Sequence, residues 1–292
     1  MNMERWKSRS LSWMLTAVSG GLILRDRLLR VTQRLRRHDA REEFFVPSGK
    51  RKLACAYLPC VEGGPTVLVC HGIGETVEHW SAVQALFHDH GIGSFVFNYS
   101  GYGKSSGRLC AEHCNEDLVS AHAELRRRVG SEAPVFVLGF SLGSGIAAQG
   151  AGGLRPPVRG LFLCEAFDSF REAACAVGVP RWLTRIVPDI WVTATTIAQI
   201  QMPVWVVHSD SDELFPLNMP ERITKACGSW GELIVVEGLA HNEPFLTAAE
   251  TYWRPVMERI LWGNGLESCR VSASDRRCGP ARECQSETRG QP

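Results

Sequence analysis

The sequence has little net charge, no regular cysteine spacing and no apolar run long enough to cross a bilayer. Its 32 lysines and arginines nearly balance 31 aspartates and glutamates, which leaves a formal net charge of +1. Binding to nucleic acid rests on a basic surplus or patch, so we expect no nucleic-acid partner. The 11 cysteines stand at irregular spacings without a CxxC pair. This pattern excludes a disulfide framework and favours a reducing compartment, so it indicates a cytoplasmic protein.

One short cluster, Cys110, His113 and Cys114, has the ligand types of a zinc site. A structural zinc site needs four ligands, and the sequence offers no matching second half. We therefore expect neither a metal nor another cofactor.

The N-terminal segment, residues 1–41, differs from the rest of the chain. Its apolar stretch from Leu11 to Leu24 lies between basic residues and is shorter than the roughly 20 residues that span a bilayer. Between residues 24 and 35, leucine and valine recur at helical spacing with arginines between them, the pattern of a basic amphipathic helix. Two interpretations stay open, a helix on an anionic membrane surface and a helix packed on the domain. A cleaved secretory signal is a third, although no small-residue cleavage site follows Leu24.

From residue 42 to residue 263, short β-branched runs alternate with longer amphipathic segments. The alternation predicts an α/β domain with a mostly parallel central sheet and helices on both faces. The predicted strands are 44–46, 52–58, 66–70, 94–98, 135–138, 160–164, 204–208 and 233–237, the first two forming a hairpin. The predicted helices are 78–90, 116–129, 142–151, 217–227 and 244–261, with Pro255 expected to kink the last.

Two segments depart from this alternation. Residues 168–201 form an apolar insert that includes Trp182 and Trp191, and we expect a short helical lid there. Residues 264–292 are rich in Ser, Gly, Arg and Glu and hold almost no large apolar side chain. Because such a tail buries too little surface to offset its ordering entropy, we expect it to be disordered.

The sequence GFSLG at residues 139–143 follows an apolar strand and precedes a helix of small residues. A serine on such a sharp strand-to-helix turn projects its hydroxyl above the sheet edge, and flanking glycines leave room for the turn. The helix N-terminus beneath it also favours developing negative charge. The five residues alone would fit a tight turn in any α/β protein, but both flanks favour Ser141 as a nucleophile.

A serine nucleophile requires a histidine base and an acid that orients the histidine. Asp212 lies in the loop after the strand 204–208, and His241 follows the next strand, 233–237. Loops at the carboxyl ends of parallel strands gather at one edge of a sheet. The order Ser141, Asp212, His241 therefore predicts a catalytic triad. The competing interpretations are a helix cap for the acid and a solvated loop histidine, and neither explains this order.

The HGIG sequence at residues 71–74 follows the predicted strand 66–70. Its glycines allow the backbone to approach a substrate closely. We expect the backbone N–H groups of Ile73 and Leu142 to bind the oxyanion of a tetrahedral intermediate.

Between residues 42 and 261 the chain resembles the α/β-hydrolase superfamily and, within it, the Bem46-like and ABHD-type serine hydrolases. The matching motifs are HGIGE at 71–75, NYSGYGKSSG at 98–107, GFSLG at 139–143, DELFP at 212–216 and EGLAHN at 237–242. The resemblance implies the α/β-hydrolase fold. It also selects Asp212 over Asp210, the fallback, because the family's acid usually stands four residues before the proline of this loop.

Two parts of the resemblance bear on the substrate. The HGIGE loop is similar to that of monoacylglycerol lipases. The segment 98–107 and the short lid are similar to the Bem46-like branch, some members of which remove acyl chains from S-acylated proteins at membranes. This chain lacks the cysteine cluster of those enzymes at its extreme N-terminus, so the acyl substrate stays open.

The sequence as a whole predicts a serine hydrolase that cleaves a carboxylic ester or thioester through an acyl-serine intermediate. We expect Trp182 and Trp191 of the lid to contact a small-molecule or lipid acyl substrate. A membrane surface stays one of the open interpretations for the N-terminus. Two alternatives use the same triad, an acyltransferase and a serine peptidase. A third alternative is a non-catalytic relative that binds an apolar ligand.

Overall fold

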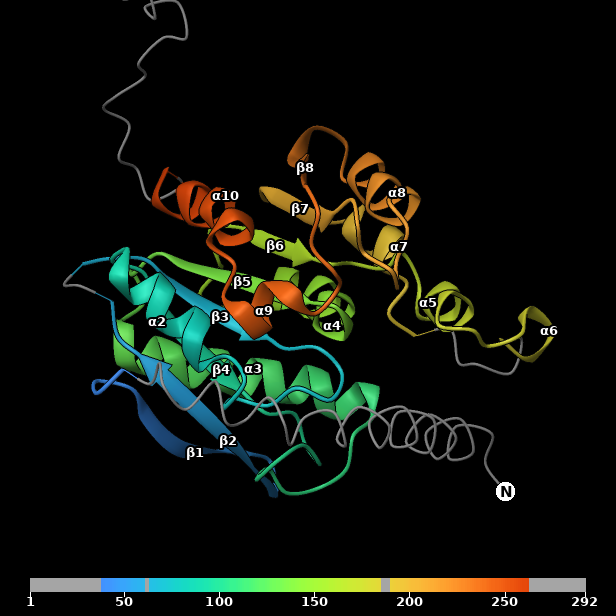
Figure 1. Ribbon diagram of the computed structural model, residues 1–292. Coiled ribbons are helices and arrows are strands. Elements are labelled where there is room, and N and C mark those ends of the chain that lie inside the picture. The colour runs from blue at the N-terminus through green and yellow to red at the C-terminus, as the bar shows by residue number, and fades with distance from the viewer. Residues whose placement is uncertain (1–37, 61–62, 185–189, 263–292) are drawn as a thin grey trace, which may run out of the picture.

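The computed structural model describes residues 38–60, 63–184 and 190–262 (Figure 1). Most of the predicted N-terminal segment and the predicted C-terminal tail therefore lie outside the described residues. The strands are β1 (Glu42–Ser48), β2 (Arg51–Leu58), β3 (Thr66–Cys70), β4 (Gly93–Phe97), β5 (Val135–Phe140), β6 (Leu161–Cys164), β7 (Val204–Ser209) and β8 (Gly231–Val236). The helices are α2 (Ser81–Asp89), α3 (Ala111–Val129), α4 (Leu142–Gly150), α5 (Phe170–Ala176), α6 (Arg181–Thr184), α7 (Thr193–Ile197), α8 (Asn218–Ala226), α9 (Glu243–Thr247) and α10 (Glu250–Trp262).

The strands form one sheet in the order β1-β2-β4-β3-β5-β6-β7-β8. β2 pairs antiparallel with both β1 and β4, and every other neighbouring pair is parallel. The predicted hairpin and the mostly parallel sheet are confirmed. Because β3, β5, β6, β7 and β8 run in one direction, their carboxyl ends share one edge, where the loops that follow them can meet.

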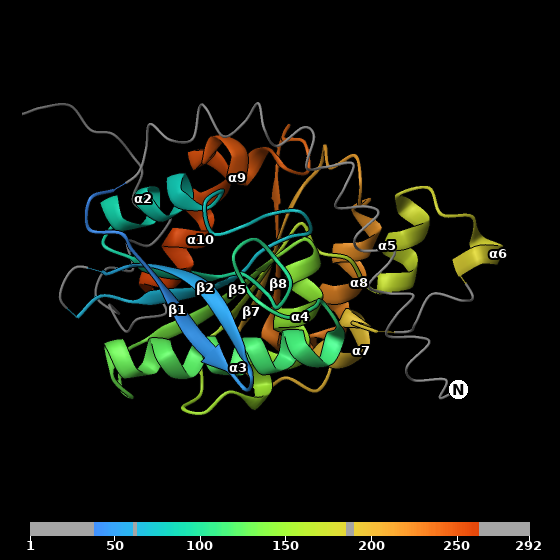
Figure 2. The same cartoon turned by 90° about the horizontal axis from the view of Figure 1, so that it is seen from below.

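Helices cover both faces of the sheet (Figures 1 and 2). Successive side chains of a strand point to opposite faces, and β3 supplies both cores in this way. Val67 and Val69 pack in the core that includes Trp253 of α10. Leu68 packs in the other core with Ile146 of α4. Burial of both faces of the sheet therefore explains why these strands are nearly continuous apolar runs in the sequence.

The predicted helix over residues 244–261 is wrong as a single element. α9 ends at Thr247 and α10 begins at Glu250, with Ala248 between them in the left-handed conformation (φ 49°, ψ 47°). The indole Nε1 of buried Trp253 donates to the carbonyl of Pro244 at 2.8 Å. The break between α9 and α10 therefore occurs where Trp253 packs back against the start of α9. α10 continues through Pro255 to its end at Trp262.

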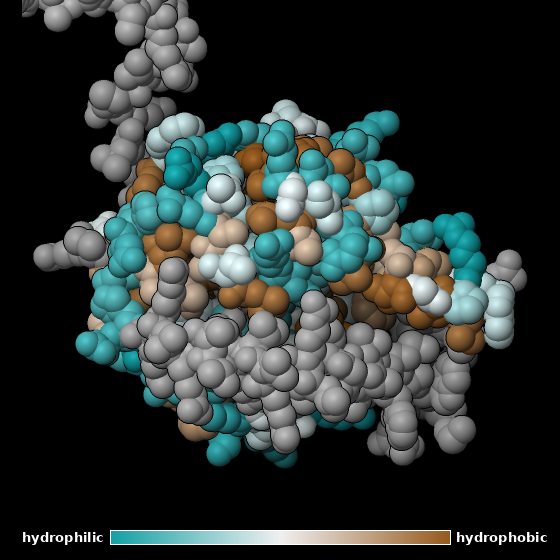
Figure 3. Space-filling model, viewed as in Figure 1, coloured by the Kyte–Doolittle hydropathy of each residue, from teal (hydrophilic) through white to brown (hydrophobic). Residues whose placement is uncertain are grey.

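The predicted lid separates β6 from β7 and includes the short helices α5, α6 and α7. α7 contacts α4 and α8, whereas α5 and α6 extend from the side of the domain in both ribbon views. Apolar surface lies over α5 and α6 (Figure 3), where the residues Val177 and Trp182 are 47% and 73% exposed. Within the described ranges, every helix is too short or too polar to span a membrane.

Candidate active site

Ser141 lies on the sharp turn between β5 and α4. Its backbone has φ 50° and ψ −118°, in the left-handed half of conformational space that a residue with a side chain rarely adopts. The flanking glycines make the turn possible, because a Cβ at Gly139 would collide with the carbonyl of Gly143, and a Cβ at Gly143 would collide with that of Cys70. Strain of this kind persists only where the surrounding structure enforces it and is common at functional sites.

The structure brings together the three side chains that the sequence predicts as a triad. Ser141 Oγ lies 2.9 Å from His241 Nε2, and His241 Nδ1 lies 2.7 Å from Asp212 Oδ2. A carboxylate only accepts, so Nδ1 carries the proton and Nε2 is left to accept one from the serine hydroxyl. His241 and Ser141 are 1% and 5% exposed, so the proton path is largely shielded from water.

Asp212 is held by its own loop. Its Oδ1 accepts the backbone N–H groups of Leu214 at 2.7 Å and Phe215 at 2.9 Å. Burial alone would raise the pKa of Asp212, but hydrogen bonding, above all with His241, outweighs it and holds this pKa well below its ordinary value. The acid facing His241 is therefore ionised.

The fallback acid, Asp210, lies outside this arrangement. Its side chain is exposed, accepts the backbone N–H of Gly238 at 2.8 Å and accepts from the Ser211 hydroxyl at 2.8 Å. These bonds lower its pKa, the bond to the Gly238 N–H most strongly. Asp210 braces the loop instead of contacting His241.

The predicted oxyanion loop lies next to Ser141. Gly72 N–H donates to Oε2 of buried Glu75 at 2.9 Å. The backbone N–H groups of Ile73 and Leu142 donate to no acceptor among the described residues. Unpaired donors at the edge of a water-poor site are suited to a developing negative charge.

Glu75 supports this loop from below, a role that sequence reasoning did not assign. Its Oε2 also accepts the indole N–H of Trp80 at 2.7 Å. Burial raises the pKa of Glu75 to about 8, and the donors Gly72 and Trp80 oppose part of that rise. The residue stands in the quoted HGIGE motif, so the signal was present in the sequence.

Two further polar side chains, Glu165 and His208, lie behind Asp212 and were also missed. His208 Nε2 lies 2.8 Å from the carbonyl oxygen of Phe215 and 3.5 Å from Asp212 Oδ2. Glu165 follows β6 directly, as Ser141 follows β5. A polar residue at the end of a buried parallel strand is the sequence signal that could have identified it.

An aromatic row leads from the histidine towards the lid. The ring of Phe215 lies 5.0 Å from that of His241 and 5.7 Å from Phe167, measured between centroids. Phe170 of α5 in turn packs edge-on against Trp191 at 5.5 Å. Trp191, one of the two predicted substrate contacts, is 3% exposed and lies at the end of this row farthest from His241.

Trp182, the other predicted lid contact, lies elsewhere. It is 73% exposed on α6, which stands at the outer edge of the molecule in both ribbon views. The structure does not bring Trp182 to the triad.

In the described part of the chain, one close group of three metal-ligand side chains occurs, Glu165, Asp212 and His241. The imidazole of His241 is already bonded to Ser141 and Asp212, which accounts for the group without a metal. His113, from the cysteine–histidine cluster in the sequence, has its Nδ1 2.8 Å from the carbonyl oxygen of Arg108.

Comparisons with known proteins agree with this fold. Residues 65–190 match the family model described as alpha/beta hydrolase fold. An uncharacterised protein of Mycobacterium tuberculosis is 32% identical over 195 residues, covering 65% of this chain and 68% of that protein. Human alpha/beta hydrolase domain-containing protein 17B is 26% identical over 217 residues, covering 71% of this chain and 72% of its own. A Pyrococcus furiosus esterase structure has a TM-score of 0.58 and 16% identity, covering 76% of this chain and 89% of its own.

The chain therefore belongs to the α/β-hydrolase superfamily and has the α/β-hydrolase fold. The resemblance inferred from its motifs is confirmed.

Proposed function

We propose that this protein hydrolyses a carboxylic ester or thioester through an acyl-serine intermediate on Ser141. The observation that carries the proposal is the continuous hydrogen-bonded path from Ser141 Oγ through His241 to Asp212, with contacts of 2.9 and 2.7 Å. This path gives the hydroxyl a base at hydrogen-bond distance and gives that base an ionised acid.

The geometry supports a two-step reaction. Ser141 Oγ attacks the carbonyl carbon while His241 Nε2 takes the hydroxyl proton, and the charge of Asp212 stabilises the resulting imidazolium. The oxyanion of the tetrahedral intermediate accepts from the N–H groups of Ile73 and Leu142. Collapse expels the alcohol or thiol, which receives the proton from His241. Water then attacks the acyl-serine by the same proton route and releases the acid.

The surroundings favour an acyl group with apolar character. The rings of Phe215, Phe167, Phe170 and Trp191 follow one another from the histidine to the lid, and burying apolar substrate against such rings is favourable. Transfer to an alcohol or amine instead of water, or cleavage of an amide, would use the same acyl-serine. A non-catalytic apolar-ligand protein would have no need of the strained Ser141 turn.

Labelling with a fluorophosphonate probe tests the nucleophile. We expect the wild-type protein to be labelled and Ser141→Ala to be unlabelled while keeping its thermal unfolding temperature. Persistent labelling of Ser141→Ala would exclude this nucleophile. Turnover of esters and thioesters graded by acyl length then defines the substrate class.

A matched pair of aspartate variants tests the acid. Asp212→Asn should lower kcat about 1,000-fold or more, because the amide no longer holds the productive histidine tautomer. Asp210→Asn removes a carboxylate from the same loop outside the triad, and it should turn over substrate nearly as wild type does. If Asp210→Asn loses turnover and Asp212→Asn keeps it, Asp210 and not Asp212 is the acid that orients His241.

We also propose that the basic N-terminal segment, residues 1–41, contacts an anionic membrane surface, from its alternation of arginine and apolar residues. Sedimentation with vesicles containing phosphatidylserine, compared between wild type and a variant with Arg30, Arg34, Arg36 and Arg37 changed to Glu, tests this. Equal binding of the two would remove the proposal.

A further inference from the structure

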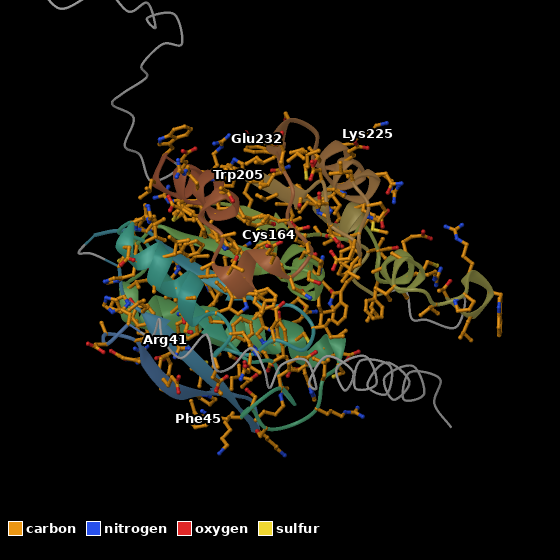
Figure 4. All side chains as sticks on the ribbon, in the orientation of Figure 1. Arg41, Phe45, Cys164, Trp205, Lys225 and Glu232 are labelled. Carbon is orange, nitrogen blue, oxygen red and sulfur yellow. The ribbon has the colours of Figure 1, made fainter. Side chains whose placement is uncertain are left out.

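Glu165 is a fully buried carboxyl group that the proposed reaction leaves without a role. It directly follows Cys164 (labelled in Figure 4) at the end of β6, which lies between β5 and β7 in the sheet. Glu165 is 0% exposed, and its backbone has φ 43°, in the left-handed region that disfavours residues with side chains. A strained, buried glutamate needs a compensating interaction to persist in a fold.

The neighbours of Glu165 are a backbone N–H donor, the hydroxyl of Tyr252 and a second acid. Its Oε1 accepts the backbone N–H of Ser209 at 2.9 Å. A carboxylate oxygen of Glu165, one of Asp212 and a ring nitrogen of His241 all lie within 4.8 Å of one another. Two negative charges at this separation in a buried site repel strongly, so one of the two carboxyl groups retains a proton.

The nearest basic group does not supply a positive charge. His208 Nε2 faces the carbonyl of Phe215 and therefore carries the proton of the neutral ring. Its Nδ1 lies 3.5 Å from Glu165 Oε2 without a hydrogen bond between them. Burial lowers the pKa of His208, which keeps the ring neutral.

Four other titratable groups face Glu165, and two of them act on its pKa in opposite directions: Asp212 raises this pKa, whereas Tyr252 lowers it. The four groups are Cys164 on its own strand, Tyr252 of α10, and Asp212 and His241 on the neighbouring loops. The Tyr252 hydroxyl donates to the carbonyl of Val207 at 3.1 Å.

We propose that Glu165 is a positioning residue whose protonated carboxyl donates a hydrogen bond to Asp212 and holds it towards His241. The inference rests on the proposed function. Asp212 then accepts from two backbone N–H groups on one oxygen, and from His241 and Glu165 on its other side. Each contact fixes the carboxylate that orients the base.

The directions in which the pKa values of Glu165 and Asp212 are shifted agree with this assignment. Burial, followed by the hydrogen bond to Asp212 and the charge of Asp212, raises the pKa of Glu165 to about 10. The same hydrogen bond contributes to the lowered pKa of Asp212. The proton therefore belongs to Glu165 over the neutral pH range.

Two variants of Glu165 separate a neutral donor from a charged acid. Glu165→Gln keeps a neutral group that donates to Asp212 and accepts from Ser209, whereas Glu165→Ala removes both interactions. We expect Glu165→Ala to lower the kcat for p-nitrophenyl butyrate about 10- to 100-fold with a smaller change in KM, because Asp212 loses its orientation. Glu165→Gln should lose at most a few-fold. An equal loss of kcat in both variants overturns the proposal. If Glu165→Ala does not fold, the test rests on Glu165→Gln alone. A loss of kcat in Glu165→Gln as large as that in Asp212→Asn then overturns the proposal.

Unfolding temperature against pH tests the proton independently of activity. A carboxyl with a folded-state pKa near 10 and an ordinary value of 4.5 destabilises the fold as pH rises between them. The unfolding temperature of Glu165→Gln should therefore rise steadily relative to wild type from pH 5 to pH 9.5. Asp210→Asn is the matched control, and its unfolding temperature should differ from that of wild type by a constant amount over this pH range.

A flat offset for Glu165→Gln would show that Glu165 is ionised and would overturn the proposal. If wild type is inert towards both the probe and the ester, the proposed function and the positioning role fail together. The pH-dependent offset would then still report the proton on Glu165, so the two failures are distinguishable.

Discussion

The two sides of Ser141 each hold a buried carboxyl group, and the neighbours of the two groups differ. On the side of the HGIGE loop, Oε2 of Glu75 accepts two N–H donors, from Gly72 and Trp80. On the acid side, Glu165 has one such donor and faces Asp212. Similar burial therefore serves two purposes, bracing a loop in one case and supporting a second carboxylate in the other.

The pKa values express this difference. Burial is the largest cause of the raised pKa in both groups, yet Glu75 reaches about 8 and Glu165 about 10. The donors around Glu75 favour its charged form, whereas the charge of Asp212 opposes ionisation of Glu165. The hydrogen-bond partners of a buried acid therefore decide at which pH it ionises.

Among changes around these two buried carboxyl groups, the largest expected effect follows from adding a methyl group at Gly72. A Cβ at Gly72 would collide with Glu75 Oε1 and lie 3.2 Å from Ser141 Cβ. Because Glu75 is held by Trp80, the loop must shift and move the Ile73 N–H away from the oxyanion. We expect Gly72→Ala to lower kcat about 100-fold or more.

Ester turnover by purified protein measures this loss. Gly153→Ala is the matched control, because a Cβ there meets nothing within 4 Å. Wild-type kcat in Gly72→Ala would contradict the placement of the loop.

Removing the bracing acid should destabilise the fold. Glu75→Ala leaves the N–H of Gly72 and the indole N–H of Trp80 buried without an acceptor, and each orphaned donor costs about 1–3 kcal/mol. We expect the free energy of unfolding in urea to fall by about 2 kcal/mol or more. Glu75→Gln keeps an acceptor and should be at least as stable as wild type at pH 6, so equal losses in the two variants would contradict the bracing role.

The pH dependence of stability sharpens the comparison between the two acids. A carboxyl whose pKa is raised on folding stabilises the protein below its ordinary value, 4.5, and this contribution is lost as pH rises through the folded-state pKa. Relative to Glu75→Gln, wild type should lose up to about 1.4 kcal/mol per pH unit until about pH 8. Relative to Glu165→Gln, the loss should continue towards pH 10. Chemical denaturation across this pH range measures the free energy of unfolding of wild type and both variants. If the two losses end at the same pH, the proposed difference between Glu75 and Glu165 is wrong.

The smallest expected effect comes from removing one donor of Glu75. Trp80→Phe retains an aromatic ring among Phe140, Phe245 and Trp253, while Glu75 keeps the Gly72 N–H. We expect a loss of about 1 kcal/mol in urea denaturation. A loss equal to that of Glu75→Ala would mean that packing of the indole, and not its hydrogen bond, supports the loop.

Much of the sheet could be predicted from sequence because the inner strands β3, β4, β5 and β6 are short apolar runs that are buried on both faces. The helix boundaries were less accurate. α3 begins at Ala111 after an extended Cys110 without a side-chain cap, so no local signal marked its start. The break between α9 and α10 accompanies the long-range packing of Trp253, and local periodicity could not show it.

The site divides in the same way. Ser141, Asp212 and His241 could be proposed from the sequence because each follows a strand of a parallel sheet, and such strand ends converge. Glu75 was visible in a motif but had no partner until Trp80 was placed beside it. Glu165 and His208 carry no spacing that reveals their contact with Asp212.

The sequence by itself determined the alternation of strands and helices, the glycines around Ser141 and the order of Ser141, Asp212 and His241 along the chain. These depend on local sterics and on a burial pattern with fixed periods along the chain. Only the tertiary structure decided which groups hold Asp212 in place and which buried carboxyl keeps its proton. The physical reason is that ionisation depends on solvation and on charges a few ångströms away in space, and folding brings those groups together from distant parts of the chain.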